Sequence, residues 1–173
     1  TVYHTVWDDV ADWYIEASKG SANNSILAYI LETLVKLTHP FAPFLTETIW
    51  QTLKWEEDSI LAISDWPTKP KFNQKDADEF EEIRAIVNEI RLIRSAMHLK
   101  NDINLYHSGD KFLEVHSELI RSLARLSAVK GVEAGKGLHL VNTERVCWLD
   151  VDEQTITNYL EQQEQSRAEQ EKL

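Results

Sequence analysis

Cysteine, methionine, glycine and proline are all scarce in this chain of 173 residues, which contains one, one, five and four of them. The single cysteine, Cys147, excludes an internal disulfide and fits a reducing compartment. No apolar run approaches the roughly 18 residues of a membrane span, and no basic segment followed by an apolar one opens the chain. We therefore expect a cytoplasmic protein with no membrane partner.

The signatures of catalysis are also missing. The sequence has no glycine-rich phosphate loop, no His-Glu-x-x-His pair and no nucleophile elbow. Its six histidines (4, 39, 98, 107, 116 and 139) lack the spacing of metal ligands, and solvation on helix faces explains its carboxylates. We expect the chain alone to hold no metal or cofactor and to catalyse nothing, so a free-standing enzyme is the weakest functional hypothesis.

Positive charge is in short supply, because 18 Lys and Arg residues face 29 Asp and Glu residues, for a net charge of −11. A domain that holds RNA by electrostatics alone is usually basic. The balance therefore argues against RNA binding as a bulk property and leaves it to a local basic patch. The charge favours an alternative function, a helical module that packs on protein partners and never touches RNA. An apolar content of 43%, with six tryptophans, is enough for a core.

Hydrophobic periodicity predicts helices over residues 2–18, 25–38, about 44–54 and 76–99. Gly20 is the expected end of the first helix, and one of residues 23–25 (Asn-Asn-Ser) the expected N-cap of the second. Residues 59–64 are rich in β-branched side chains and predict an extended connector. Three helices before this connector and one after it predict a four-helix bundle.

The hydrophobic period changes after Lys100. A strand at 102–106, a helix over 110–127 and two strands within 128–150 predict a small α/β unit. From Asp152 onward a Glu- and Gln-rich stretch predicts a solvated helix with a thin apolar seam. The expected fold is mainly α. It consists of a helical bundle (1–100), a small α/β subdomain (101–151) and the start of a C-terminal coiled-coil-like helical arm (152–173).

The most informative string runs from His39 to Trp50 and reads HPFAPFLTETIW. Two prolines three residues apart cannot both lie inside one helix, yet helical patterns stand on both sides of them. The string therefore predicts a rigid corner between two helices. Pro43 is expected in the first turn of the second helix, and His39 is expected to cap or brace the corner.

This corner, together with Asp12-Trp13-Tyr14-Ile15-Glu16, resembles the anticodon-binding bundle of class I aminoacyl-tRNA synthetases. Its His-Pro-Phe form is most similar to the valyl-tRNA synthetases. The Trp66-Pro67 dipeptide and the Arg91-x-x-Arg94 pair follow in the order found in that family, and the similarity is sharp over residues 7–94. The isoleucyl and leucyl enzymes share the bundle and stay an alternative, although their corners usually carry Ala in place of His39.

The resemblance implies a C-terminal fragment of an enzyme that attaches valine to tRNA with ATP and Mg²⁺. Those cofactors would belong to the upstream catalytic domain of the same chain, whose ATP-handling motifs are absent here. This part would dock the anticodon stem-loop of a valine tRNA, and the parent enzyme would be a monomer.

The basic residues best placed for RNA lie on the predicted helix over 76–99. Arg84, Arg91 and Arg94 fall on one side of it, Lys100 extends that line past the helix end, and Lys19 is a weaker candidate. A basic stripe suits single-stranded anticodon bases, whose phosphates need neutralising. Alternatively, these arginines pair with the neighbouring acids Glu81, Glu82 and Glu89.

Two tryptophans, Trp13 and Trp50, lie in the family-like strings. Both also fall on apolar patterns, and aromatic side chains dominate protein cores. We expect them in the core rather than stacked on bases.

Overall fold

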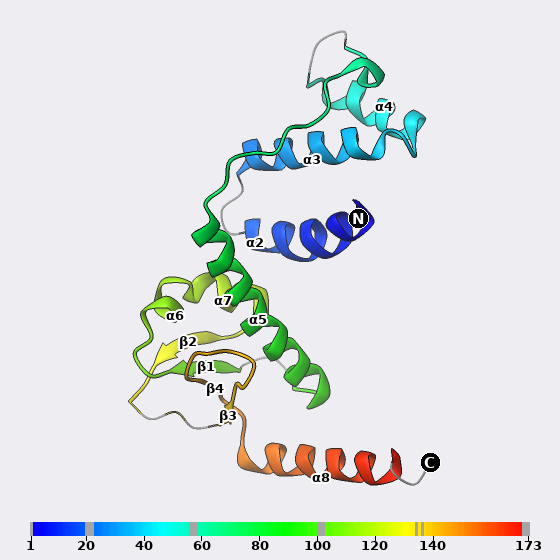
Figure 1. Ribbon diagram of the computed structural model, residues 1–173. Coiled ribbons are helices and arrows are strands. Elements are labelled where there is room, and N and C mark those ends of the chain that lie inside the picture. Colours follow the sequence, from blue (N-terminus) through cyan, green and yellow to red (C-terminus); the bar gives the residue numbers. More distant parts are fainter. Residues whose placement is uncertain are drawn as a thin grey trace. The chain divides into compact units, whose positions relative to one another are not determined.

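The computed structural model describes residues 2–19, 23–55, 59–99, 103–133, 135 and 137–170, with side chains up to residue 161. The chain forms two compact units, Thr1–Phe72 and Asn73–Leu173, and most of their elements are labelled in Figure 1. The division falls ahead of the long helix α5 (Gln74–Ala96), whereas the sequence pattern predicted one bundle of this helix and the three before it. The predicted limits at residues 100 and 151 stay predictions.

The first unit is helical. Its opening helix is wound in three consecutive parts, α1 (Val2–His4), η1 (Thr5–Tyr14) and α2 (Ile15–Ser18). In η1 the turns are wide, and the amide that follows it, Ile15 N–H, donates to Val10 O, five residues back. The unit continues with α3 (Asn24–Thr38), α4 (Pro43–Leu53) and the 3₁₀ turn η2 (Leu61–Ile63). The predicted cap of α3 is confirmed, because the Asn23 side chain accepts from the Ser25 and Ile26 amides.

The predicted corner lies between α3 and α4. Pro43 occupies the first turn of α4, where its missing amide leaves no hydrogen bond unmade. His39 Nδ1 lies 2.8 Å from Thr46 Oγ1, and that hydroxyl donates to Ala42 O at 2.9 Å. These bonds join the end of α3 to the first turn of α4, so the prediction that His39 braces the corner is confirmed.

The connector over 59–64 is not extended throughout, as the sequence predicted, because η2 interrupts it. Glu47 Oε2 accepts from Leu61 N–H at 3.1 Å, and the Ser64 amide donates to Leu61 O at 3.0 Å. A strand needs a partner for its backbone groups, and within the described residues this segment joins no sheet. The Glu47 carboxylate and the turn η2 supply hydrogen bonds to those backbone groups instead.

A four-stranded sheet forms the centre of the second unit, in the order β2-β1-β4-β3. Its strands are β1 (Asn104–His107), β2 (Ala128–Gly131), β3 (Leu138–His139) and β4 (Cys147–Leu149). β1 is parallel to β2 and antiparallel to β4, and β4 is antiparallel to β3. The sequence predicted two strands within 128–150, where three are found, because β3 is too short to show an alternating pattern. Gly137 precedes β3 with φ +116°, and a Cβ there would collide with Leu149 O.

The single helix predicted over 110–127 is two helices, α6 (Lys111–Val115) and α7 (Ser117–Ala124), which break at His116. They connect the parallel strands β1 and β2, as a parallel pair requires. Asp110 caps α6, because its Oδ1 accepts from the Phe112 and Leu113 amides.

Helix α5 carries the apolar stripe that closes the core of the second unit. Its side chains Ile83, Ile86, Val87 and Ile90 are at most 1% exposed, and the helix packs against α7. The rest of this core comes from the sheet and the crossover helices, chiefly Leu105, Leu113, Ile120, Leu123, Leu140 and Leu149. Helix α8 (Glu153–Gln170) follows the sheet (Figure 1).

The predicted fold class is confirmed at its coarse level, since helices dominate and a small sheet accompanies them. Of the helices in the described ranges, none has both the length and the apolar character needed to cross a membrane.

Candidate nucleic-acid interface

The predicted arginines of α5 lie where that helix meets the end of α7. Arg91 donates to Leu123 O from Nε at 3.3 Å and from Nη2 at 2.9 Å. Arg94 Nη1 donates to the carbonyls of Ala124 at 2.7 Å and Arg125 at 2.6 Å. The last carbonyls of a helix have no partner in the helix itself, and its C-terminus favours positive charge. Both guanidinium groups therefore stabilise the C-terminus of α7.

The alternative role, pairing with neighbouring acids, is seen for Arg84. Arg84 Nη1 lies 2.9 Å from Glu81 Oε1, one turn away on α5. The other two acids have different partners. Glu82 pairs with Arg145, and the buried Glu89 accepts from the Val141 and Asn142 amides at 2.7 and 2.9 Å. Glu89 therefore fixes the loop that follows β3 onto α5.

Of the two lysines predicted to contact RNA, Lys19 lies within the described residues and Lys100 does not. Lys19 pairs with Glu16 on α2, in the first unit. A phosphate contact by any of the five predicted residues stays a prediction.

Two basic residues that were not predicted lie at the end of α7, where Arg91 and Arg94 bind. Arg125 ends α7 in the left-handed conformation, with φ +53°, and is exposed. Arg121 lies one turn earlier and pairs with Glu118 on the surface, Nη2 to Oε2 2.9 Å. We call Arg91, Arg94, Arg121 and Arg125 the arginine seam. The spacing of four between Arg121 and Arg125 was visible in the sequence, but their nearness to α5 was not.

A second set of basic residues lies in the irregular segment 65–72 of the first unit. Lys69 and Lys71 are exposed there between two exposed aromatic residues, Trp66 and Phe72. The interleaving of lysines and aromatics in WPTKPKF was the available signal.

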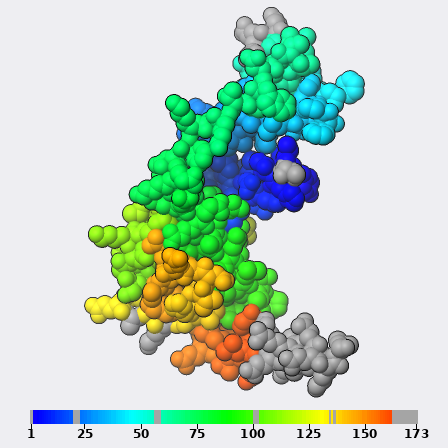
Figure 2. Space-filling view, in the orientation of Figure 1, coloured from blue at the N-terminus to red at the C-terminus, as the bar shows by residue number. Residues whose placement is uncertain are grey.

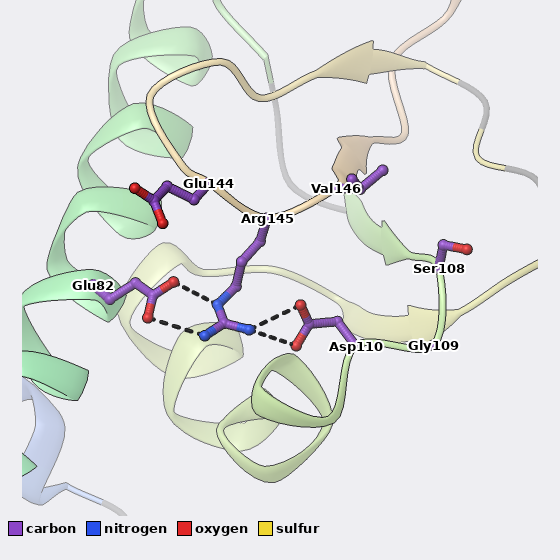
Figure 3. Close-up of a pocket in the computed structure, with 7 residues that line it drawn as sticks. All are labelled: Glu82, Ser108, Gly109, Asp110, Glu144, Arg145 and Val146. Carbon is purple, nitrogen blue, oxygen red and sulfur yellow. Dashed lines mark hydrogen bonds and ion pairs between the residues drawn. The ribbon is translucent and has the colours of Figure 1, made fainter. Parts of the chain in front are cut away.

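A surface hollow in the second unit has the opposite character (Figure 3). It is lined by Glu82, Ser108, Gly109, Asp110, Glu144, Arg145 and Val146. Arg145 reaches between two carboxylates. Its Nη1 is 2.9 Å from both oxygens of Asp110, and its Nη2 is 3.1 Å from Glu82 Oε2. Because three carboxylates (Glu82, Asp110 and Glu144) and one guanidinium line it, the hollow carries net negative charge and repels phosphate.

The ionisation of Asp110 reflects this arrangement. Burial opposes its charged form, but the bonds from Arg145 and from the Leu113 and Phe112 amides outweigh burial and hold the pKa of Asp110 below its ordinary value. The bond with Glu82 raises the pKa of Arg145. Three segments far apart in sequence are thereby joined through one side chain: α5, the start of α6 and the loop between β3 and β4.

Other groups in the described part show little reactivity. Burial raises the pKa of the Cys147 thiol to about 12, so the thiol is protonated and unreactive at neutral pH. Within the ranges given above, no three His, Cys, Asp or Glu side chains gather as metal ligands. Trp13 and Trp50 are 5% and 1% exposed, which confirms their predicted place in the core.

Comparison with known proteins gives consistent matches. A family model described as the anticodon-binding domain of tRNA ligase matches residues 1–108. The valine–tRNA ligase of Geobacillus kaustophilus is 41% identical over 106 residues, which cover 55% of this chain and 12% of that protein. The valine–tRNA ligase of Listeria innocua is 38% identical over 125 residues, which cover 66% of this chain and 14% of that protein. The valine–tRNA ligase of Pseudothermotoga lettingae is 32% identical over 164 residues, which cover 87% of this chain and 19% of that protein.

The chain thus spans at most 19% of the length of these three relatives. The matches confirm the resemblance to the valyl-tRNA synthetases that the His39–Trp50 corner predicted.

Proposed function

Because this chain belongs to the family of anticodon-binding domains of tRNA ligases, we propose that it docks the anticodon stem-loop of a valine tRNA. The family match over residues 1–108 carries the proposal, and the relatives, all valine–tRNA ligases, support the choice of valine. The isoleucyl and leucyl enzymes and a protein-interaction module are the alternatives.

The rest of the proposal concerns the parent enzyme. An upstream catalytic domain of the same chain binds ATP and Mg²⁺ and attaches valine to the tRNA. This part, which holds no cofactor, contributes to the choice of tRNA. Residues 1–100 belong to the anticodon-binding region of the parent enzyme, and α8 begins a C-terminal arm. The parent is cytoplasmic and monomeric.

The arginine seam gives the proposal a physical basis in the second unit. Guanidinium groups match phosphate oxygens in geometry and stay charged at every physiological pH. The seam takes two arginines from α5 and two from the last turn and C-cap of α7, in a chain whose net charge is −11. A local basic cluster of this kind is what an acidic protein needs to hold an RNA backbone.

The function is tested by titrating the full chain, at low salt, with a valine tRNA. The same tRNA with a changed anticodon and an isoleucine tRNA are titrated in parallel. We expect the native valine anticodon to bind most tightly. Preference for the isoleucine tRNA would indicate that the chain is part of an isoleucyl-tRNA synthetase. Equal binding of all three tRNAs would contradict anticodon recognition.

Salt dependence tests the seam itself. We expect Arg91→Ala and Arg125→Gln each to reduce the slope of log affinity against log salt by about one unit. The bond from Arg94 to Arg125 uses the Arg125 carbonyl, so Arg125→Gln leaves that bond in place. Arg145→Met is the matched control, because its guanidinium already lies between two carboxylates. An unchanged slope in both seam variants would contradict a phosphate contact there.

A further inference from the structure

The segment 65–72 crosses the surface of the first unit without helix or strand (Figure 2, green). Pro67 and Pro70 fix two of its φ angles, and Tyr29 Oη of α3 donates to Thr68 O at 3.4 Å. Trp66 and Phe72, near its two ends, are 62% and 57% exposed. The backbone is therefore restricted while its aromatic faces stay accessible.

Positive charge lies between these aromatic residues. Lys69 and Lys71 are both exposed, and Lys69 Nζ is 5.3 Å from the centroid of the Phe72 ring. From Trp66 to Phe72 the sequence contains no acid, although acids outnumber bases in the whole chain. Lysines spaced along an irregular backbone and flanked by aromatic rings match the needs of single-stranded nucleic acid, which offers phosphates and base faces together.

A small pocket adjoins Trp66. Its volume is about 170 Å³, and its lining includes Lys36, His39, Leu61, Ser64, Asp65 and Trp66. That is roughly the liquid volume of six waters and far below the volume of drug-sized ligand sites, so it suits a single ring system.

The polar groups of the pocket favour a ligand that donates hydrogen bonds. The Thr46 hydroxyl gives its proton to a carbonyl, so His39 Nδ1 must donate to Thr46 Oγ1. In the neutral ring this makes His39 Nε2 an acceptor. The Asp65 carboxylate is a second acceptor. Two donors of the lining already have partners, because the Ser64 hydroxyl donates to Leu61 O at 2.9 Å and the Lys36 ammonium lies 2.8 Å from Glu32 Oε1. An exocyclic amine of a base fits these acceptors better than a carbonyl does.

We propose that the pocket beside Trp66 takes one unstacked, amine-bearing base of single-stranded RNA, while Lys69 and Lys71 hold the adjoining phosphates. The base stacks on Trp66, and its amine donates to His39 Nε2 or Asp65. Duplex RNA is excluded, because its bases are stacked and paired and cannot enter a pocket of this size. This inference rests on the proposed function in its choice of RNA, but it names a site separate from the arginine seam.

The test measures binding of labelled RNA hexanucleotides of cytidine and of uridine to the full chain at low salt. These two pyrimidine runs have equal charge and differ at position 4, where cytosine has an amine and uracil a carbonyl. We expect the cytidine run to bind more tightly. Trp66→Ala should weaken it about tenfold, as loss of a stacking side chain typically does. The double variant Lys69→Ala/Lys71→Ala should reduce the salt slope by about 1.4, or 0.7 per phosphate.

The matched control is Trp7→Ala, because Trp7 is a second exposed tryptophan of the same unit, at 55% exposure. Equal losses in the Trp66 and Trp7 variants, equal binding of the two hexanucleotides, or no binding at all would each overturn the proposal. So would equal binding of an acidic hexapeptide, which would mark the segment as a site for any polyanion. Thermal unfolding of each variant verifies that it is folded.

The two proposals fail separately. If valine tRNA binds with anticodon preference and Trp66→Ala leaves its affinity unchanged, the pocket assignment is wrong and the proposed function stands. If the cytidine run binds through Trp66 while the tRNAs show no anticodon preference, the pocket stands and the proposed function is wrong.

Discussion

At the scale of single residues, the arginines of the second unit differ in what they bind. Arg145 lies between the carboxylates of Glu82 and Asp110, whereas Arg91 and Arg94 bind peptide carbonyls at the end of α7. Sequence periodicity located the arginines of α5 correctly on one helix. It could not find their acceptors, because these lie 30 to 32 residues away along the chain. Arg145, which pairs with two carboxylates, had no local signal at all.

The ion pairs of Arg145 lead to a prediction about pH. Arg145→Met should lower the free energy of unfolding of the second unit by about 2 kcal/mol at pH 7, because two partly buried carboxylates lose their charged donor. The pKa of Asp110 is lowered in the folded state. Its contribution to stability is therefore present above the unfolded pKa near 4, and is lost as the pH falls through the lower folded value.

Urea unfolding of the two proteins at pH 7 and at about pH 3 measures this difference. The gap between wild type and Arg145→Met should shrink at the acid pH. Arg121→Met is the control, because its pair with Glu118 is exposed and contributes little. A gap that is the same at both pH values would show that Arg145 acts through packing on the Phe112 ring, 3.9 Å away, and not through Asp110.

At the scale of elements, α7 ends against α5 and not in solvent. It is eight residues long, and Arg94 binds the carbonyls of its last residue and of the residue after it. We expect Arg94→Ala to cost about 1–2 kcal/mol of unfolding free energy, because two charge-assisted bonds are lost. Hydrogen exchange of the Leu126 amide, which donates to Arg121 O, should accelerate at the same time.

Arg84→Ala is the matched control on the same helix. Arg84 pairs with Glu81 one turn away, and such helix pairs contribute only a few tenths of a kcal/mol. If Arg84→Ala and Arg94→Ala destabilised the protein equally, the bonds to the end of α7 would not explain the role of Arg94.

The elements differ in how far the sequence predicted them. The long helices follow from periodicity, and the corner at His39–Trp50 follows from its prolines, since both signals are local. The break at His116, the two-residue strand β3 and the turn η2 were missed. Their form depends on distant partners, such as Glu47 for the amide of Leu61, 14 residues away. The pocket beside Trp66 was missed for the same reason, because its lining comes from the end of α3 and from the connector after α4.

At the scale of the whole molecule, each unit has a core of its own. Trp50, Val35 and Leu61 form a buried cluster in the first unit, whereas the core of the second joins α5 to the sheet. Compact units with separate cores are expected to unfold as separate cooperative units. We therefore expect urea to produce two transitions rather than one.

Two variants assign the transitions. Trp50→Ala should cost about 3–5 kcal/mol and shift only the transition of the first unit, because a large side chain that is 1% exposed leaves a cavity. Its indole also donates to Ser59 Oγ at 2.8 Å. Arg145→Met should shift only the other transition. Circular dichroism follows both unfolding transitions. Trp66→Ala is the control, because it changes an exposed tryptophan and should shift neither transition. A single transition that both Trp50→Ala and Arg145→Met displace would contradict separate cores, and the chain would then fold as one cooperative domain.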